Sequence, residues 1–164
     1  MSLAILLELV HVYSVFWFVG GLLGRTVALS QARRATELRD LETIMRVSSA
    51  FEMRMVRPGS MVLLAAGLLT AVLKGWPVLG PLTGTPPYWV FASLLIFLSA
   101  FTLIPLVFLP RGRVYRAALA DAREQGTVTP RLTAALGDRT VALAHAWEWI
   151  AIALITILMV AKPF

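Results

Sequence analysis

Two pairs of glutamate and histidine, each spaced three residues apart, carry the clearest capacity for chemistry. Glu8 and His11 lie in the first long apolar stretch, and His145 and Glu148 lie in the last. Residues three apart share a face of a helix, so each carboxylate can reach its own imidazole. A charge at the centre of a membrane helix costs about 2.5–3.5 kcal/mol on insertion scales, and such residues usually face the bundle interior and pair. The pairs therefore mark these two stretches as the place to expect a site.

Four kinds of chemistry fit the pairs. His11 and His145 suit the axial ligands of haem b, and together with Glu8 and Glu148 they form a nitrogen and oxygen set for a divalent metal. A glutamate–histidine pair also suits a proton relay, or it simply tightens helix packing. At about 1.5 Å per residue, the predicted depths of the two histidines differ by about 12 Å, so a shared iron requires tilted or shifted helices.

Three further residues are candidates for contacts to a cofactor. Trp17 belongs to an aromatic cluster that is bulky enough to line one. Arg25 and Arg57 lie at the predicted membrane boundary, where a guanidinium can pair with a haem propionate or a lipid phosphate. The alternative for both arginines is anchoring of the helices, and for Trp17 it is ordinary packing.

The elements that must position these residues are membrane helices. Of 164 residues, 59% are hydrophobic and 15% are charged, which is far more apolar than a soluble domain of this size. A crossing helix needs about 20 apolar residues. The chain is predicted to be an all-α transmembrane four-helix bundle, a single domain whose first span is retained rather than cleaved, with spans at 3–23, 58–74, 88–109 and 140–161.

The basic residues predict the orientation of the spans. Residues 24–57 and 110–139 hold 13 of the 15 lysines and arginines, and such loops face the cytoplasm. Both termini are then expected outside. The net charge of +6 is explained by this asymmetry, so nucleic acid is not an expected partner.

The cytoplasmic loops are themselves predicted to be helical. Apolar residues recur at helical spacing after Asp40, a predicted N-cap, and Thr129–Pro130 is an N-cap followed by an N1 proline. Gly126 is placed to end the helix that continues from the third span. We therefore expect helices that extend beyond the bilayer into the cytoplasm, with Pro105 kinking the third span.

The segment HVYSVFWFVGGLLGR, from His11, resembles the first helix of a loose group of small bacterial four-helix membrane proteins. VRPGSMVLLAAGLLTAVLKGW, from Val56, and PPYWVFASLLIFL, from Pro86, are most similar to an uncharacterised family of predicted integral membrane proteins in that group. The group also includes the copper-resistance CopD-type proteins and the HemJ-type protoporphyrinogen oxidases. The resemblance implies a bacterial inner-membrane location, and the first-helix histidine of HemJ-type proteins falls on His11.

These observations favour a membrane protein that binds a cofactor, haem b first and a divalent metal second, between its first and fourth helices, with a redox role. A cofactor-free, non-enzymatic subunit of a larger membrane complex and a small metal transporter are the alternatives. Whether the protein is an enzyme stays open, because no P-loop, zinc-protease, nucleophile-elbow or dinucleotide motif is present. The bilayer is the expected partner, with other membrane subunits or a second copy as further ones.

Overall fold

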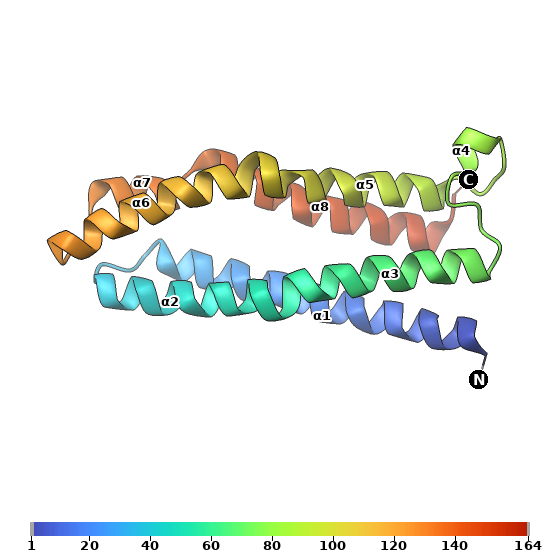
Figure 1. The fold of residues 1–164 in the computed structure, drawn as a ribbon, viewed down its shortest axis with the longest axis horizontal. Coiled ribbons are helices and arrows are strands. Elements are labelled where there is room, and N and C mark those ends of the chain that lie inside the picture. The colour runs from blue at the N-terminus through green and yellow to red at the C-terminus, as the bar shows by residue number, and fades with distance from the viewer. Residues whose placement is uncertain (1, 164) are drawn as a thin grey trace. The chain divides into compact units, whose positions relative to one another are not determined.

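A computed structural model describes residues 2–163, which form helices joined by turns and contain no strand (Figure 1). The elements in chain order are α1 (Leu3–Ala32), α2 (Leu38–Phe51), η1 (Glu52–Val56), α3 (Arg57–Leu73), α4 (Gly80–Thr83), α5 (Trp89–Leu103), η2 (Ile104–Phe108), α6 (Leu109–Gln125), α7 (Pro130–Leu136) and α8 (Arg139–Ala161). The prediction of an all-α fold is confirmed.

Within the described residues, four helical stretches are long and apolar enough to cross a membrane. They are Leu3–Ala32, Leu38–Leu73, Trp89–Gln125 and Pro130–Ala161, of 30, 36, 37 and 32 residues. At about 1.5 Å per residue the first three are at least about 45 Å long and α8 alone, with 23 residues, is about 34 Å long, whereas the hydrocarbon core is about 30 Å thick. The helices therefore extend beyond a bilayer, and one predicted span overlaps each of them.

Local sequence sets the ends of the helices near the basic loops. Thr129 is the N-cap of α7, where its hydroxyl accepts a hydrogen bond from the Leu132 N–H at 3.2 Å, and Pro130 takes the first turn. Gly126 follows α6 with φ of +67°, a left-handed conformation that glycine adopts without strain. Glu37, rather than Asp40, is the N-cap residue of α2.

The two middle helices each contain a π-helical segment next to a proline. In η1 the Arg57 N–H donates to the Glu52 carbonyl, and Pro58 follows directly. In η2, which itself contains Pro105, the Leu109 N–H donates to the Ile104 carbonyl, and Pro110 follows directly. A proline inside a helix removes one backbone hydrogen bond and clashes with the carbonyl four residues back, so widening the local turn relieves the clash.

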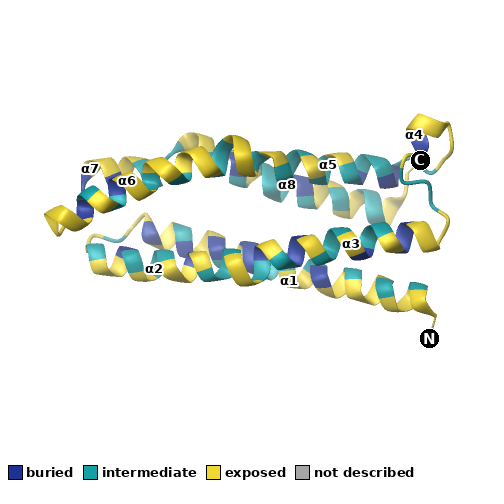
Figure 2. Ribbon diagram, viewed as in Figure 1, coloured by how far each residue is buried: buried dark blue, intermediate teal, exposed yellow. Residues whose placement is uncertain are grey.

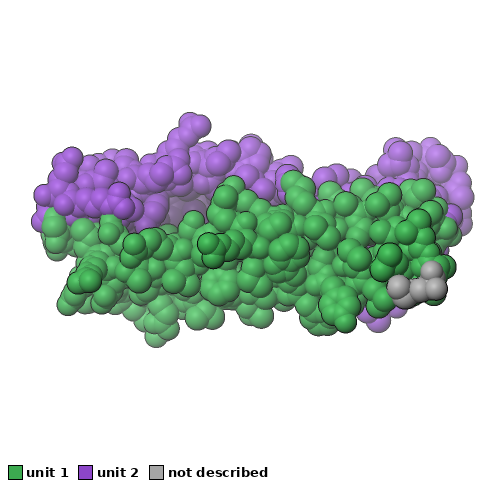
Figure 3. Space-filling view, turned by 60° about the horizontal axis from the view of Figure 1, so that its bottom comes forward, with its two compact units in different colours: residues 1–74, 126–128 green, residues 75–125, 129–164 purple. Residues whose placement is uncertain are grey.

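The chain divides into two compact units, which Figure 3 colours separately. The first comprises α1, α2, η1 and α3, with the short segment 126–128. Here α1 packs along α2, η1 and α3. Close approach depends on glycine, because a Cβ on Gly21 would lie 2.6 Å from Met55 Cβ and one on Gly24 would lie 2.4 Å from Phe51 Cε1. These glycines therefore serve a contact within the chain.

The second unit comprises α4 to α8, in which α5 packs against α8 and α6 against α7. Small side chains, such as Ala118 and Ala122 on α6, are fully buried. At the far end of α8, the Lys162 ammonium lies 5.3 Å from the ring centre of Trp76 and 5.8 Å from that of Trp89. Cation and indole pairs of this kind suit a membrane interface.

Large apolar side chains cover the outside of the long helices, where Figure 2 shows many exposed positions. Phe16 on α1 is 70% exposed and Leu143 on α8 is 71% exposed. An apolar surface of this extent would be unfavourable in water, because transfer of apolar area into water costs about 25 cal/mol per Å². Lipid is the solvent that these faces require.

Candidate functional site

A hydrogen bond from the imidazole of His11, on α1, fixes this side chain against α3 of the first unit. Its Nδ1 lies 2.9 Å from the Leu63 carbonyl oxygen of α3. A carbonyl oxygen only accepts, so Nδ1 carries a hydrogen, and in the neutral imidazole this leaves the lone pair on Nε2. Gly67 makes room for the ring, because a Cβ there would lie 2.8 Å from His11 Cε1. The imidazole is thus fixed in orientation against the backbone of α3 at Gly67.

Glu8 lies one turn before His11 on α1 and pairs with Lys74, the C-cap residue that directly follows α3. Its Oε1 accepts from the Lys74 ammonium at 2.8 Å, with side-chain exposures of 49% and 29%. This pair joins the first turns of α1 to the residue that ends α3. The charge of Glu8 is therefore balanced by a lysine, and this ion pair makes the carboxylate a weaker ligand for a metal ion.

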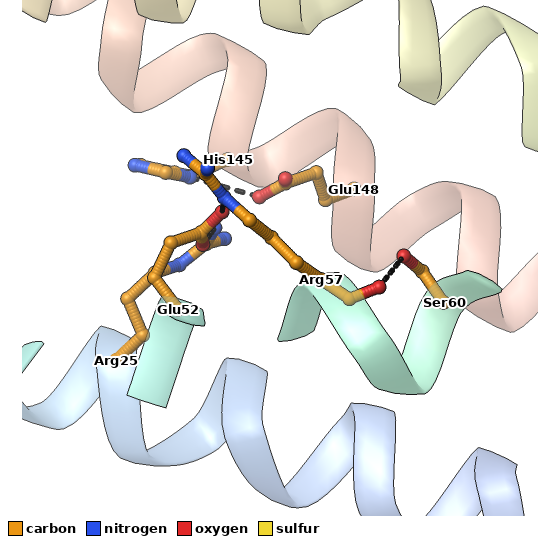
Figure 4. A network of polar contacts seen from close by, with 6 residues as sticks. All are labelled: Arg25, Glu52, Arg57, Ser60, His145 and Glu148. Carbon is orange, nitrogen blue, oxygen red and sulfur yellow. Dashed lines mark hydrogen bonds and ion pairs between the residues drawn. The ribbon is translucent and has the colours of Figure 1, made fainter. Parts of the chain in front are cut away.

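His145 and Glu148 form the pair that their spacing predicts, within α8 of the second unit. Nδ1 of His145 lies 2.8 Å from Glu148 Oε2, and the side chains are 19% and 14% exposed (Figure 4). The imidazole also stacks on Phe108, with ring centres 4.8 Å apart at 25°. Phe108 is the last residue of η2, so the π-helical segment supplies the aromatic ring that covers one face of the imidazole.

The tryptophans near the histidines have separate surroundings. Trp147 donates its indole N–H to the Ser99 hydroxyl at 3.1 Å, which joins α8 to α5. Trp17 is 40% exposed on α1. Six residues place it about 120° around the helix from His11, so the two do not share a face.

Arg25 and Arg57 meet at a residue that the sequence analysis did not single out, Glu52 of η1. Arg25 Nη1 donates to Glu52 Oε2 at 2.9 Å, and Arg57 Nε donates to Oε1 at 3.2 Å (Figure 4). Arg25 is only 7% exposed. One signal was available in the sequence, since Glu52 is the single acidic residue among the arginines directly before an apolar span.

The predicted site residues thus fall into separate local groups. His11, Glu8, Arg25, Arg57 and Trp17 belong to the first unit, and His145 and Glu148 belong to the second. Among residues 2–163, no three histidine, cysteine, aspartate or glutamate side chains are grouped so as to hold a metal ion. What the geometry provides is one anchored histidine in each unit.

Comparison with family models gives a match over nearly the whole chain. A family model described as "Predicted integral membrane protein (DUF2269)" matches residues 5–163. No curated protein and no solved structure matches the chain.

Proposed function

The chain belongs to the family of predicted integral membrane proteins designated DUF2269, and from that premise we propose that it binds haem b in the membrane, with His11 as an axial ligand. Bound haem b supplies a one-electron couple, so the role is electron transfer or redox chemistry at the membrane. The HemJ-type resemblance, in which the first-helix histidine falls on His11, supports the same residue.

The observation that carries the proposal is the hydrogen bond from His11 Nδ1 to the Leu63 carbonyl at 2.9 Å. A histidine that ligates a metal almost always donates its other ring N–H to a carbonyl or carboxylate, which fixes the ring and makes Nε2 more basic. The neutral imidazole with its lone pair on Nε2 is the form that iron binds. The donor chemistry of His11 therefore fits a haem ligand.

The position of His11 along α1 also suits a group buried in lipid. It lies eight residues after Leu3, about 12 Å into the helix, and its carbonyl accepts from the buried Ser14 hydroxyl at 2.7 Å. Arg25 lies about 21 Å further along the same axis, which is beyond the reach of a propionate on a haem centred at His11. We therefore leave Arg25 out of the proposed haem contacts.

Absorbance of protein purified in detergent, after expression with added haem precursor, tests the proposal. The wild type is expected to show a Soret band that His11→Ala loses. Gly67→Ala should weaken the band as well, because the added Cβ would lie 2.8 Å from His11 Cε1 and displace the ring. Gly20→Ala is the matched control, since its Cβ would meet only Met55 Cε at 3.5 Å.

Three results would overturn the proposal. One is a wild type without a Soret band. Another is a band that survives His11→Ala and disappears in His145→Ala, which would identify the ligand as the histidine that Glu148 holds at 2.8 Å. The last is a stoichiometric divalent metal in elemental analysis of haem-free protein. Co-purification of a haem-free wild type with other membrane chains would favour the subunit role instead.

A further inference from the structure

We propose that Arg57, held by Glu52, binds the phosphate of an anionic phospholipid at the arginine-rich end of the membrane-spanning segment. This inference is independent of haem. It assigns Arg57 to a lipid headgroup, whereas the sequence alone also allowed a haem propionate.

Glu52 pairs with two arginines whose exposures differ widely. Both carboxylate oxygens are occupied, Oε2 by Arg25 at 2.9 Å and Oε1 by Arg57 at 3.2 Å. The Arg25 side chain is 9% exposed, and the Arg57 side chain is 59% exposed. Arg57 is therefore the arginine of this group whose guanidinium is open to the surroundings.

Glu52 also orients the Arg57 guanidinium. Arg57 donates to the carboxylate through Nε, so this bond fixes the side of the guanidinium nearest its alkyl chain. The two terminal NH₂ groups lie at the opposite end of the planar group. Those terminal groups form the fork that matches two oxygens of one phosphate. Arg54, three residues earlier and also exposed, adds a second guanidinium in the preceding turn.

The hydropathy of the helix places this fork at headgroup depth. Residues 58–73 are apolar and contain no charge, and they span about 24 Å, which is less than the hydrocarbon thickness of about 30 Å. A short span draws headgroups inward or extends its flanking side chains to meet them. Arg57, the first charged residue beyond this stretch, lies where a lipid phosphate would lie.

Native mass spectrometry of the purified protein with equimolar phosphatidylglycerol and phosphatidylcholine tests the inference. The wild type should retain phosphatidylglycerol preferentially. Arg57→Gln should bind it about tenfold more weakly, as expected for loss of a charge-assisted, two-point contact. Arg57→Lys should also lose most of the preference, because an ammonium keeps the charge but lacks both the fork and the Nε bond to Glu52.

Arg46→Gln is the matched control. Arg46 is exposed on α2 and lies about 16 Å before Arg57 along the helix, so its loss removes the same charge outside the site. Equal phosphatidylglycerol binding by Arg57→Lys and wild type, or an equal loss in Arg46→Gln, would overturn the inference in favour of unspecific attraction. Thermal stabilisation by inorganic phosphate without stabilisation by phosphatidylglycerol would overturn it too, because the ligand would then be free phosphate.

Discussion

At the scale of single residues, the two histidines show how different partners fix the same side chain. His145 is held by Glu148, three residues along its own helix, so the helical repeat alone brings them together. His11 is held by the backbone of Leu63, 52 residues away, and this requires α1 and α3 to pack closely. The second arrangement depends on Gly67, whose missing side chain leaves space for the ring.

Gly21→Ala should destabilise the protein by about 1–3 kcal/mol, the usual cost of overpacking a closely packed contact. The added Cβ would lie 2.6 Å from Met55 Cβ and 3.1 Å from the Val56 backbone nitrogen, and a backbone atom cannot move aside cheaply. Unfolding in detergent mixtures, followed by circular dichroism, measures the change.

Gly20→Ala is the neighbouring control for this prediction. Its Cβ would meet only the end of the Met55 side chain at 3.5 Å, so alanine should be neutral or stabilise by up to about 1 kcal/mol through its higher helix propensity. If both alanines have the same effect, the close packing of α1 on η1 is not what Gly21 provides.

At the scale of helices, long-range polar contacts join neighbours whose surfaces are otherwise apolar. Lys74 joins α3 to α1 through Glu8, and Trp147 joins α8 to α5 through Ser99. Apolar surface gives little preference for helix contact over lipid, so small residues and hydrogen bonds between helices contribute much of the specificity. Each of the two middle helices also contains a π-helical segment close to a proline, η1 before Pro58 and η2 around Pro105.

Trp147→Phe and Ser99→Ala should each lower the free energy of unfolding by about 0.5–1.5 kcal/mol, because each removes one side of a hydrogen bond between α5 and α8. The double variant should lose less than the two single losses combined. A double-mutant cycle in the same unfolding assay measures this coupling.

Two controls belong to that cycle. Trp149→Phe changes the same residue type two positions further along α8, and Thr102→Ala removes a hydroxyl that donates to the Ser99 carbonyl of its own helix at 2.7 Å. If the coupling energy between Trp149 and Thr102 equals that between Trp147 and Ser99, the hydrogen bond between Trp147 and Ser99 is not a specific contact.

At the scale of the whole molecule, the distribution of basic residues predicts the orientation in the membrane. Residues 24–57 and 110–139 hold 13 of the 15 lysines and arginines. The helices that carry them extend well past the length a bilayer needs, so these basic ends lie in water. By the positive-inside rule we propose that they face the cytoplasm and that both termini face outward.

Cysteine labelling in sealed cells tests the orientation directly, because the chain contains no cysteine of its own. A membrane-impermeant maleimide should label Leu82→Cys in intact cells, since Leu82 is 73% exposed in the connection between the second and third spans. Asp40→Cys and Glu124→Cys should be labelled only after the cells are opened. Labelling of Asp40→Cys in intact cells, with Leu82→Cys protected, would reverse the assignment.

The sequence by itself determined the features that depend on local patterns. Apolar stretches of sufficient length dictated membrane helices, because an unpaired backbone is too costly in lipid. Thr129–Pro130 and Gly126 determined helix ends through bonds within one turn, and spacing alone predicted the pair of His145 and Glu148.

Only the tertiary structure decided which residues distant in sequence meet. The partner of His11 is a backbone carbonyl, which has no signature in residue type, and Glu8 pairs with a lysine 66 positions away. Glu52 belongs to the arginine cluster because the packing of η1 against α1 brings its carboxylate to Arg25. Such contacts depend on the rotation and register of packed helices, and the periodicity of a single helix does not determine either.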